Sequence, residues 1–492
     1  MADRLVEYVQ HRLVADRAPV EAIVELTDEV VKVLVASFDS RKGSWPYEIV
    51  TGLDGALESA SGRSDYTFST NAMIAYALQL AGGRIERSSL APAVVRYPPR
   101  EGDAARRAEI DRIIARLMGE IAKQSARLAN PRLRSASSKR RLDAPHEPPL
   151  TISLTFGWDD PFTLTWLLEI LATVDSPPQP FFSDLQKRAE DLVKRVLQSR
   201  YELDPNRQAP QPIRILQVKA AEDVEHAFPL LRVLQLRAAL GRTRNDFANL
   251  GDIAGAREYL FNLMHRQLSE SQLENGSFDP AELVFALEGW LLANDAEPDF
   301  EVVDRVFAVM AEQHERTPYW RPFKPFKATA QGLVLLPQSV EIANSLLRIC
   351  ARPALQQRRY FSKHQALLAR YTDWVLGRRF NGSFSVSGAP HALVGWESEF
   401  THRLDRIHLW QTSQALIYLQ HYAAMLREHL AQHMLDLAGF QARTTVDGTP
   451  ADTAKADSEW EDFKRTDPMN TAVATGSRYL VYEAIDRDFI LP

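Results

Sequence analysis

The stretch Phe162-Thr-Leu-Thr-Trp-Leu-Leu-Glu-Ile-Leu171 is apolar on nearly every side when it is drawn as a helix, with Glu169 as its single charge. A helix without a polar face must be surrounded by protein. The stretch therefore predicts a buried helix inside a helical fold.

The segment from Ala104 to Leu128 shows the opposite pattern, because its aliphatic residues form one stripe and Arg, Asp and Glu fill the other face. The stripe consists of Ile110, Ile113, Ile114, Leu117 and Ile121. This spacing is typical of a helix that buries one side and exposes the other. We expect it to cover buried helices of the first kind.

Both kinds of segment occur six times and alternate along the chain. The apolar segments run from Ser69 to Leu80, Pro161 to Thr173, Glu225 to Leu240, Pro280 to Ala293, Gln338 to Cys350 and His408 to Met425. The amphipathic segments cover about 19–38, 103–128, 182–200, 252–271, 299–315 and 359–378. Strand-like stretches are few and short, so the pattern predicts an all-α fold of two concentric helix rings.

Three short segments repeat a Gly-Ser-aromatic ending. They are Asp39 to Trp45, Gln272 to Phe278 and Arg378 to Phe384. Each follows a helical segment, so Gly43, Gly276 and Gly382 are expected in the left-handed turn that closes a helix. The aromatic residue would then fold back between neighbouring helices.

The second of these segments, Gln272-Leu-Glu-Asn-Gly-Ser-Phe278, resembles the QxxxGxW repeat of the terpene cyclase and protein prenyltransferase superfamily, with Phe in place of Trp. The six-fold alternation over 19–435 is similar to the (α/α)6 toroid of that superfamily, which many glycosidases share. The resemblance implies six inner and six outer helices within residues 1–435. It implies no activity directly.

The catalytic motifs of the resembled superfamily are not matched. Asp159-Asp160 lacks the first aspartate of DxDD, and Asp159-Asp-Pro-Phe-Thr163 lacks the last position of DDxxD. Cys350 is the single cysteine, which excludes an intrachain disulfide, Cys-rich zinc sites and the two Cys ligands of lanthionine-type cyclases. P-loop, GxSxG and HExxH motifs do not occur. We therefore expect no metal and no cofactor.

Composition narrows the class of protein further. With 58 Lys+Arg against 64 Asp+Glu, the net charge of −6 excludes a generally basic nucleic-acid binder. The first residues lack the apolar core of a secretory signal, and no stretch approaches the roughly 20 apolar residues of a membrane span, so a cytoplasmic protein is expected. Cys350 lies in the apolar run from Ser345 and is interpreted as a small buried hydrophobe, with a nucleophile as the alternative.

The starts of the inner helices would line one mouth of a toroid and form the predicted site. The predicted ligand-binding residues are Trp158, His226, Trp396, His402, Arg406, His408 and Trp410. Asp159, Glu397 and Glu399 are the catalytic candidates if the protein is an enzyme, because acid–base chemistry needs two carboxylates in different environments. Further polar residues of this mouth are Tyr66, Ser69, Asn71, Asp160, Glu225, Asp279, Glu282, Gln338, Glu341 and Gln411.

Structural roles compete with these functional ones. Asp160-Pro161 and Asp279-Pro280 have the pattern of an N-cap followed by proline at the first helical position. His226 precedes an apolar run, and its alternative to ligand binding is a structural place in the wall of the cavity. In the dense segment from Gly395, an ion-pair network of Glu399, His402, Asp405 and Arg406 is an equal alternative to a ligand site.

Three segments lie outside the expected helical body. A basic loop near 130–150, with five Lys/Arg in 132–141, either contacts phosphate or an acidic partner or is simply solvated. Residues 436–458 are interpreted as a linker. The tail 459–492 ends in Phe489-Ile-Leu-Pro492, so it docks on the toroid or on a partner protein, and the chain itself could be part of a longer protein.

The preferred hypothesis is a ligand- or protein-binding module of a bacterial-type cytoplasmic system, acting through the mouth and the hydrophobic tail. The alternative is a terpene cyclase-like or glycosidase-like enzyme with a central cavity lined by carboxylates and aromatic rings.

Overall fold

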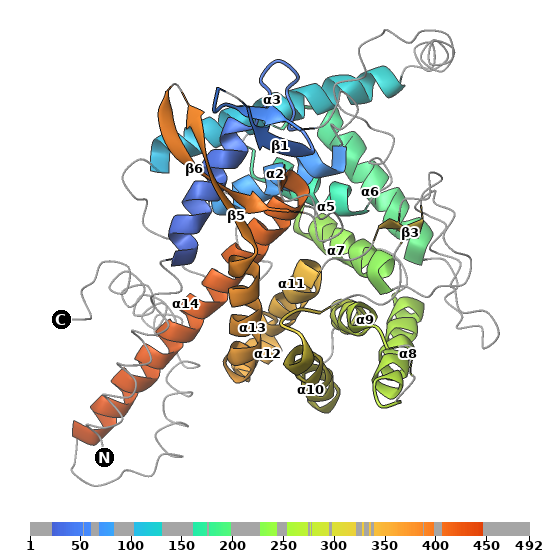
Figure 1. Ribbon diagram of the computed structural model, residues 1–492. Coiled ribbons are helices and arrows are strands. Elements are labelled where there is room, and N and C mark those ends of the chain that lie inside the picture. The colour runs from blue at the N-terminus through green and yellow to red at the C-terminus, as the bar shows by residue number, and fades with distance from the viewer. Residues whose placement is uncertain are drawn as a thin grey trace.

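Helices dominate the protein in a computed structural model and make up 73% of the residues that it describes (Figure 1). The described residues are 22–52, 54–60, 68–82, 103–129, 161–174, 177–197, 227–243, 253–273, 276, 278–294, 298–320, 327–328, 334–335, 339–386, 388–397 and 406–445. None of the helices within these ranges is long and apolar enough to cross a membrane. The basic loop 132–141 and the tail 459–492 lie outside the described residues.

The six predicted apolar helices are confirmed, and we call them the inner helices. They are α2 (Phe68–Ala81), α5 (Pro161–Ala172), α7 (Ala227–Thr243), α9 (Pro280–Leu292), α11 (Ser339–Cys350) and α14 (Leu409–Thr445). In α9 every residue from Pro280 to Leu291 is buried, so no side of this helix meets solvent. Helix α14 continues to Thr445 and so enters the segment 436–458 that was interpreted as a linker.

The six amphipathic helices are also present, and we call them the outer helices. They comprise residues 22–36, α3 (Asp103–Ala129), α6 (Phe181–Leu197), α8 (Ala254–Glu270), α10 (Phe300–Arg316) and α13 (Tyr360–Gly377), with the short α12 (Pro353–Gln357) before the last. Helix α10 buries one stripe only. Its buried residues are Val302, Val303, Val306, Phe307, Met310 and His314. An exposed face remains, as the spacing predicts.

The inner helices contact one another in a closed circuit. Helix α2 contacts α5, α5 contacts α7, α7 contacts α9, α9 contacts α11, α11 contacts α14, and α14 returns to α2. Outer helices pack against this circuit, α3 on α2, α6 on α5 and α7, α8 on α9, and α13 on α11 and α14. One continuous hydrophobic cluster joins residues from all of these helices.

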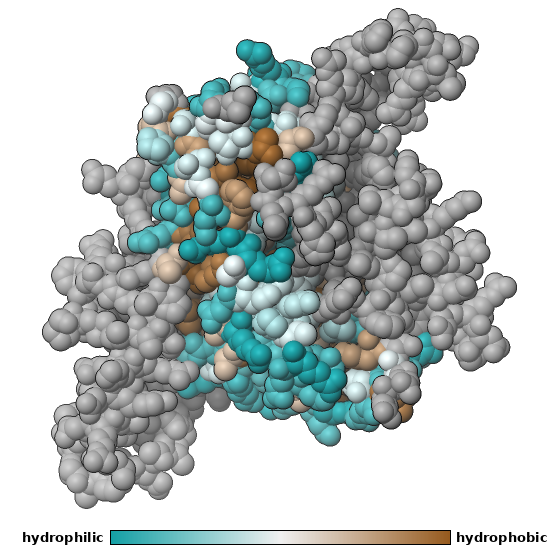
Figure 2. Space-filling view, viewed as in Figure 1, coloured by the Kyte–Doolittle hydropathy of each residue, from teal (hydrophilic) through white to brown (hydrophobic). Residues whose placement is uncertain are grey.

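Within the described residues, three small antiparallel sheets accompany the helices, and their extent was not predicted. Strands β1 (Glu48–Thr51), β2 (Leu57–Ser59) and β7 (Ile407–His408) form one sheet in the order β2-β1-β7, and β3 (Lys327–Ala328) pairs with β4 (Val334–Leu335). The longest strands, β5 (Arg379–Val386) and β6 (Ala389–Trp396), form a hairpin. On the face in Figure 2, hydrophobic residues show mainly in the region of this hairpin, where Val386 is exposed, and hydrophilic residues cover the lower helices.

The three Gly-Ser-aromatic segments differ from one another, which corrects the expectation that each closes a helix. Gly43 is left-handed, with φ 68°, but it closes a turn from Asp39 after the helix 22–36 has ended. Helix α8 already ends with Ser271 as its C-cap, so Gly276 lies beyond the helix end; a Cβ there would lie 2.0 Å from the Glu270 carbonyl oxygen, so glycine is needed for close approach. Gly382 lies inside β5, opposite Leu393.

The aromatic residue of the first segment packs as expected. Trp45 is fully buried, contacts Phe38 edge-on at 4.7 Å between ring centroids, and donates from Nε1 to the Leu34 carbonyl oxygen at 2.6 Å. Its backbone N–H donates to Asn71 Oδ1 at 2.7 Å, and Asn71 Nδ2 donates back to the Trp45 carbonyl at 3.3 Å. Asn71 therefore joins this turn to the start of α2, which is a structural role for a residue of the predicted mouth.

The first and last described helices meet directly. Gln420 Nε2 of α14 donates to Thr27 Oγ1 of the helix 22–36 at 2.9 Å, and the Leu409 N–H donates to the Tyr47 carbonyl at 3.0 Å. The β1–β7 pairing adds a third link between the two ends of the described chain.

Candidate functional site

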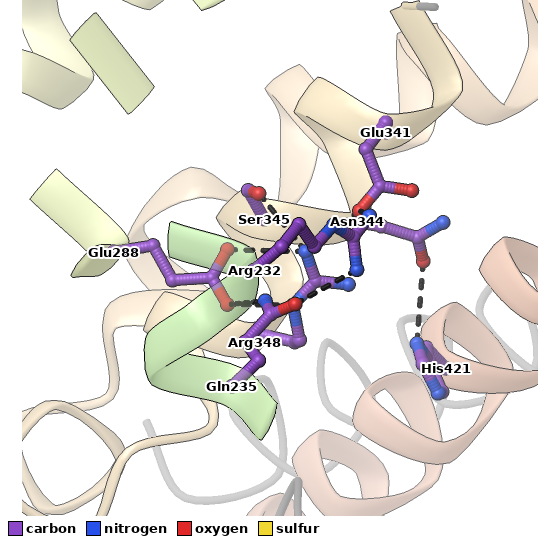
Figure 3. A network of polar contacts seen from close by, with 8 residues as sticks. All are labelled: Arg232, Gln235, Glu288, Glu341, Asn344, Ser345, Arg348 and His421. Carbon is purple, nitrogen blue, oxygen red and sulfur yellow. Dashed lines mark hydrogen bonds and ion pairs between the residues drawn. The ribbon is translucent and has the colours of Figure 1, made fainter. Parts of the chain in front are cut away.

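Polar side chains from four inner helices meet in one cluster, which we call the central network (Figure 3). Its members are Arg232 and Gln235 of α7, Glu288 of α9, Glu341, Asn344, Ser345 and Arg348 of α11, and His421 of α14. The two glutamates and Arg232 are 3–6% exposed. Charged residues are seldom buried to this degree unless they are paired.

Arg348 contacts Glu288, Glu341 and Ser345. Its Nε donates to Glu288 Oε1 at 2.7 Å and its Nη2 donates to Glu288 Oε2 at 3.0 Å, which is a bidentate pair. The same Nη2 donates to Glu341 Oε1 at 2.9 Å and to Ser345 Oγ at 3.0 Å. The planar guanidinium thus holds two carboxylates side by side.

Arg232 closes the cluster into a loop of contacts. Its Nη2 forms an ion pair with Glu341 Oε1, and its Nη1 donates to Gln235 Oε1 at 2.7 Å. Gln235 Nε2 then donates to Glu288 Oε1 at 2.7 Å. The circuit Arg232, Gln235, Glu288, Arg348 and Glu341 therefore contains two positive and two negative charges and is neutral overall.

Helical spacing places these groups on one side of each helix. Glu341, Ser345 and Arg348 follow one another at i, i+4 and i+7 along α11, and Arg232 and Gln235 are three residues apart on α7. Residues at such spacing share a helix face. Most of the other positions of these two helices carry apolar side chains of the core.

The pKa values within the network follow from this pairing. Burial acts to raise the pKa of Glu288, but Arg348, with smaller contributions from Ser345 and Arg232, holds the pKa below the ordinary value. Burial acts in the opposite direction on Arg348, and Glu288 and Glu341 raise its pKa. Glu288 and Arg348 are therefore charged at neutral pH, and Glu288 is a poor proton donor.

The other two inner helices contribute a neighbouring cluster. Arg242 of α7 forms an ion pair with Glu169 of α5, and Tyr76 of α2 hydrogen-bonds Glu169. Burial, followed by the Glu169 charge, raises the pKa of Tyr76, and the field of Arg348 reaches the same hydroxyl. On the α14 side, His421 Nδ1 lies 3.2 Å from Asn344 Oδ1. All six inner helices thus present polar groups to one region.

Two tryptophans of the inner helices contact each other. Trp166 of α5 and Trp410 of α14 meet edge-to-face, with centroids 6.0 Å apart and planes at 72°. Trp410 is one of the predicted ligand-binding residues and remains partly exposed. Trp166 precedes Glu169 by three residues and therefore lies on the same side of α5.

Other predicted site residues have structural contacts elsewhere. Trp396, at the end of β6, is buried and donates from Nε1 to the Val375 carbonyl at 2.8 Å. Arg406 and His408 both contact Glu48 of β1, at 3.1 and 3.3 Å. Trp396 thus joins the hairpin to α13, and Arg406 and His408 join β1 to the strand that leads into α14.

Of the remaining predicted residues, some have structural contacts at helix starts and others lie outside the described ranges. Asp279 caps α9 by accepting from the Ala281 N–H at 2.9 Å, so the N-cap prediction is confirmed there. Glu282 accepts from the Ala227 N–H at 2.7 Å and so joins the starts of α9 and α7. Glu397 is half-buried just after β6. Five of the predicted ligand-binding and catalytic residues lie outside the described ranges, namely Trp158, Asp159, His226, Glu399 and His402. The same holds for Tyr66, Asp160, Glu225 and Gln338 of the predicted mouth and for Asp405 of the alternative ion-pair network.

Sequence reasoning missed Arg232, Glu288 and Arg348, because it looked for site residues at the helix starts. The available signal was a charged residue in the middle of an otherwise apolar helix, where burial without a partner is costly. Glu341 alone of the four charged members belongs to the predicted mouth. Among the described residues, no group of three His, Cys, Asp or Glu has a metal-binding arrangement.

Comparison with known proteins found no matching family model, no similar curated protein and no similar solved structure.

Proposed function

We propose that the chain is a ligand-binding module of the cytoplasm, built as an (α/α)6 toroid whose ligand site is the central network. The closed circuit of inner helices and the packing of the outer helices on it support this arrangement. Apolar side chains in the ring centre would stabilise the fold as much as buried ion pairs do, or more. Charged groups at that place therefore favour a functional role.

The observation that carries the choice of binding over catalysis is the pairing of Glu288 and Glu341 with two guanidinium groups. A general acid needs a carboxyl group whose pKa is raised towards neutrality. The pKa of Glu288 is lowered instead. Preorganised, ionised groups of this kind fix the orientation of a ligand, as polar residues of small-molecule sites do.

The test is a thermal-shift screen of small metabolites against the full chain, repeated with Glu341→Gln. A ligand of the central network should raise the melting temperature of the wild type and lose most of that effect in Glu341→Gln. The matched control is Glu312→Gln, whose side chain is 62% exposed on α10 and pairs with Arg316 one turn away on the same helix. Shifts that are the same in all three proteins would reject the central network as the site.

The enzyme alternative keeps one described candidate, Glu397. A terpene cyclase-like or glycosidase-like reaction would require this residue, with Asp159 and Glu399, to carry acid–base steps. Turnover of a screened substrate that Glu397→Gln abolishes, with folding intact by circular dichroism, would favour the enzyme over the binding module.

A protein partner for the tail 459–492 and an acidic or phosphate partner for the loop 132–141 remain part of the proposal. Deleting 477–492 tests the first, with oligomeric state and capture of a co-purifying partner as readouts. If neither changes, the tail has no docking role.

A further inference from the structure

We propose that the central network and the tryptophan pair Trp166–Trp410 together bind a neutral polyhydroxyl ligand, a saccharide or a polyol. The inference rests on the proposed function and names the chemical class of its ligand. It combines three features of the described residues: charge balance, an unsatisfied acceptor and an aromatic wall.

Charge balance disfavours an ionic ligand. Arg232 and Arg348 are matched by Glu288 and Glu341 within one circuit of contacts. An anion would compete with the glutamates and a cation with the arginines, and either would have to break a buried pair, which is costly. A neutral ligand can hydrogen-bond at the edges of the circuit and leave the pairs intact.

Gln414 supplies an acceptor without a donor. Its side chain is 6% exposed, and its Oε1 has no hydrogen-bond partner among the described residues. It precedes His421 by two helical turns on α14 and therefore shares the face that reaches Asn344 of the network. Buried amide oxygens normally accept a hydrogen bond, so a donor from a ligand, such as a hydroxyl group, completes this site.

Trp410 lies on the same face of α14, three turns before His421. It meets Trp166 edge-to-face and stays partly exposed, so part of its indole ring is left for another group. The Arg348 side chain is 19% exposed, which shows that the network is not sealed from solvent. A flat apolar surface beside hydrogen-bonding groups suits a ring that carries hydroxyl groups around its edge and C–H groups on its faces.

Saturation-transfer NMR on the full chain tests the inference with matched probes. The neutral probes are glucose, maltotriose, cellotriose and myo-inositol; glucuronate and glucosamine are the anionic and cationic analogues of glucose. We expect transfer to at least one neutral probe and weaker binding of the charged analogue of any monosaccharide that binds. Equal or tighter binding of a charged analogue would overturn the inference.

Variants locate the binding. Gln414→Leu removes one buried hydrogen bond to the ligand, and Trp410→Leu removes one ring contact. Each should therefore weaken the affinity for the neutral probe about tenfold. Gln357→Leu, on the exposed end of α12, should leave it unchanged. Trp410→Phe keeps an apolar ring and serves where Trp410→Leu does not fold. Unchanged affinity in Gln414→Leu, with folding verified by circular dichroism, would reject the site.

Failure of this inference and failure of the proposed function give different results. If no neutral probe binds but another compound of the thermal-shift screen depends on Glu341, the binding module stands and the polyhydroxyl class is wrong. If no compound depends on Glu341, both are wrong.

Discussion

Arg348 and Glu288 form a bidentate ion pair, and the Glu288 side chain is 4% exposed. Replacing Glu288 by Gln leaves the guanidinium with a single carboxylate partner in a buried place. We expect the free energy of unfolding to fall by about 3 kcal/mol, as when one member of a buried pair is removed. Urea denaturation at pH 7 measures the change. The exposed Glu312→Gln should change it by no more than about 0.5 kcal/mol, and equal effects would contradict the expectation.

The same carboxylate makes stability depend on pH. Arg348 holds the pKa of Glu288 below its ordinary value of 4.5 in the folded chain. The Glu288 carboxylate therefore stabilises the fold fully at pH values above 4.5. The effect is lost as the pH falls through the lower, folded-state pKa. We therefore expect Glu288→Gln to lose less stability than the wild type on acidification below pH 4.5, as urea denaturation at a series of pH values would show. Parallel pH profiles would contradict it.

Cys350, at the end of α11, is fully buried, and burial raises the pKa of its thiol well above the ordinary range. The thiolate is the reactive form, so both effects suppress its chemistry. We expect Ellman's reagent to modify Cys350 on the order of 1,000-fold more slowly in the native chain than in guanidinium chloride. Rapid modification of a chain that keeps its helical circular dichroism would contradict the interpretation of Cys350 as a buried hydrophobe.

At the scale of elements, Gly276 decides how closely the chain leaving α8 can follow the end of that helix. An added Cβ would lie 2.0 Å from the Glu270 carbonyl oxygen, so the backbone must shift. We expect Gly276→Ala to lower the free energy of unfolding by about 1–3 kcal/mol. The control is Gly119→Ala in α3, where a Cβ meets nothing within 4 Å, and alanine should stabilise the helix by up to about 1 kcal/mol. Equal effects of the two changes would contradict this account.

The helices could be predicted from the sequence because a helix that is buried on one side or on all sides has a characteristic spacing of apolar residues. Asp279 and its proline likewise marked the start of α9. The β5–β6 hairpin could not be predicted in this way, because its Gly-Ser pair resembles a helix-ending turn and most of β5 is exposed, with little alternation. The central network was missed for another reason. Which charged residues face each other depends on which helices are neighbours, and the spacing of residues within one helix does not show this.

At the scale of the whole molecule, α14 touches both α2 and α11 and also contacts α13, β6 and β7. Ending the chain after Glu397 removes β7 and α14 and opens the circuit. We expect the shortened chain to lose its cooperative urea transition, since the apolar faces of α2 and α11 would be left in water. In the full chain, circular dichroism and tryptophan fluorescence should give coincident transitions. A sharp transition in the shortened chain would show that the other five inner helices form a stable unit without α14.

The hydrogen bond from Gln420 to Thr27 spans 393 positions of the sequence. During synthesis the N-terminal helices leave the ribosome long before α14 has been made. Their apolar faces therefore stay exposed until α14 can pack on them. Contacts between residues so distant in sequence also slow folding, because the chain must close a long loop before it gains them. Exposed apolar surface during such a delay favours aggregation. Expression of this protein should therefore depend on chaperones that hold unfinished chains, and slower translation would prolong the exposed period.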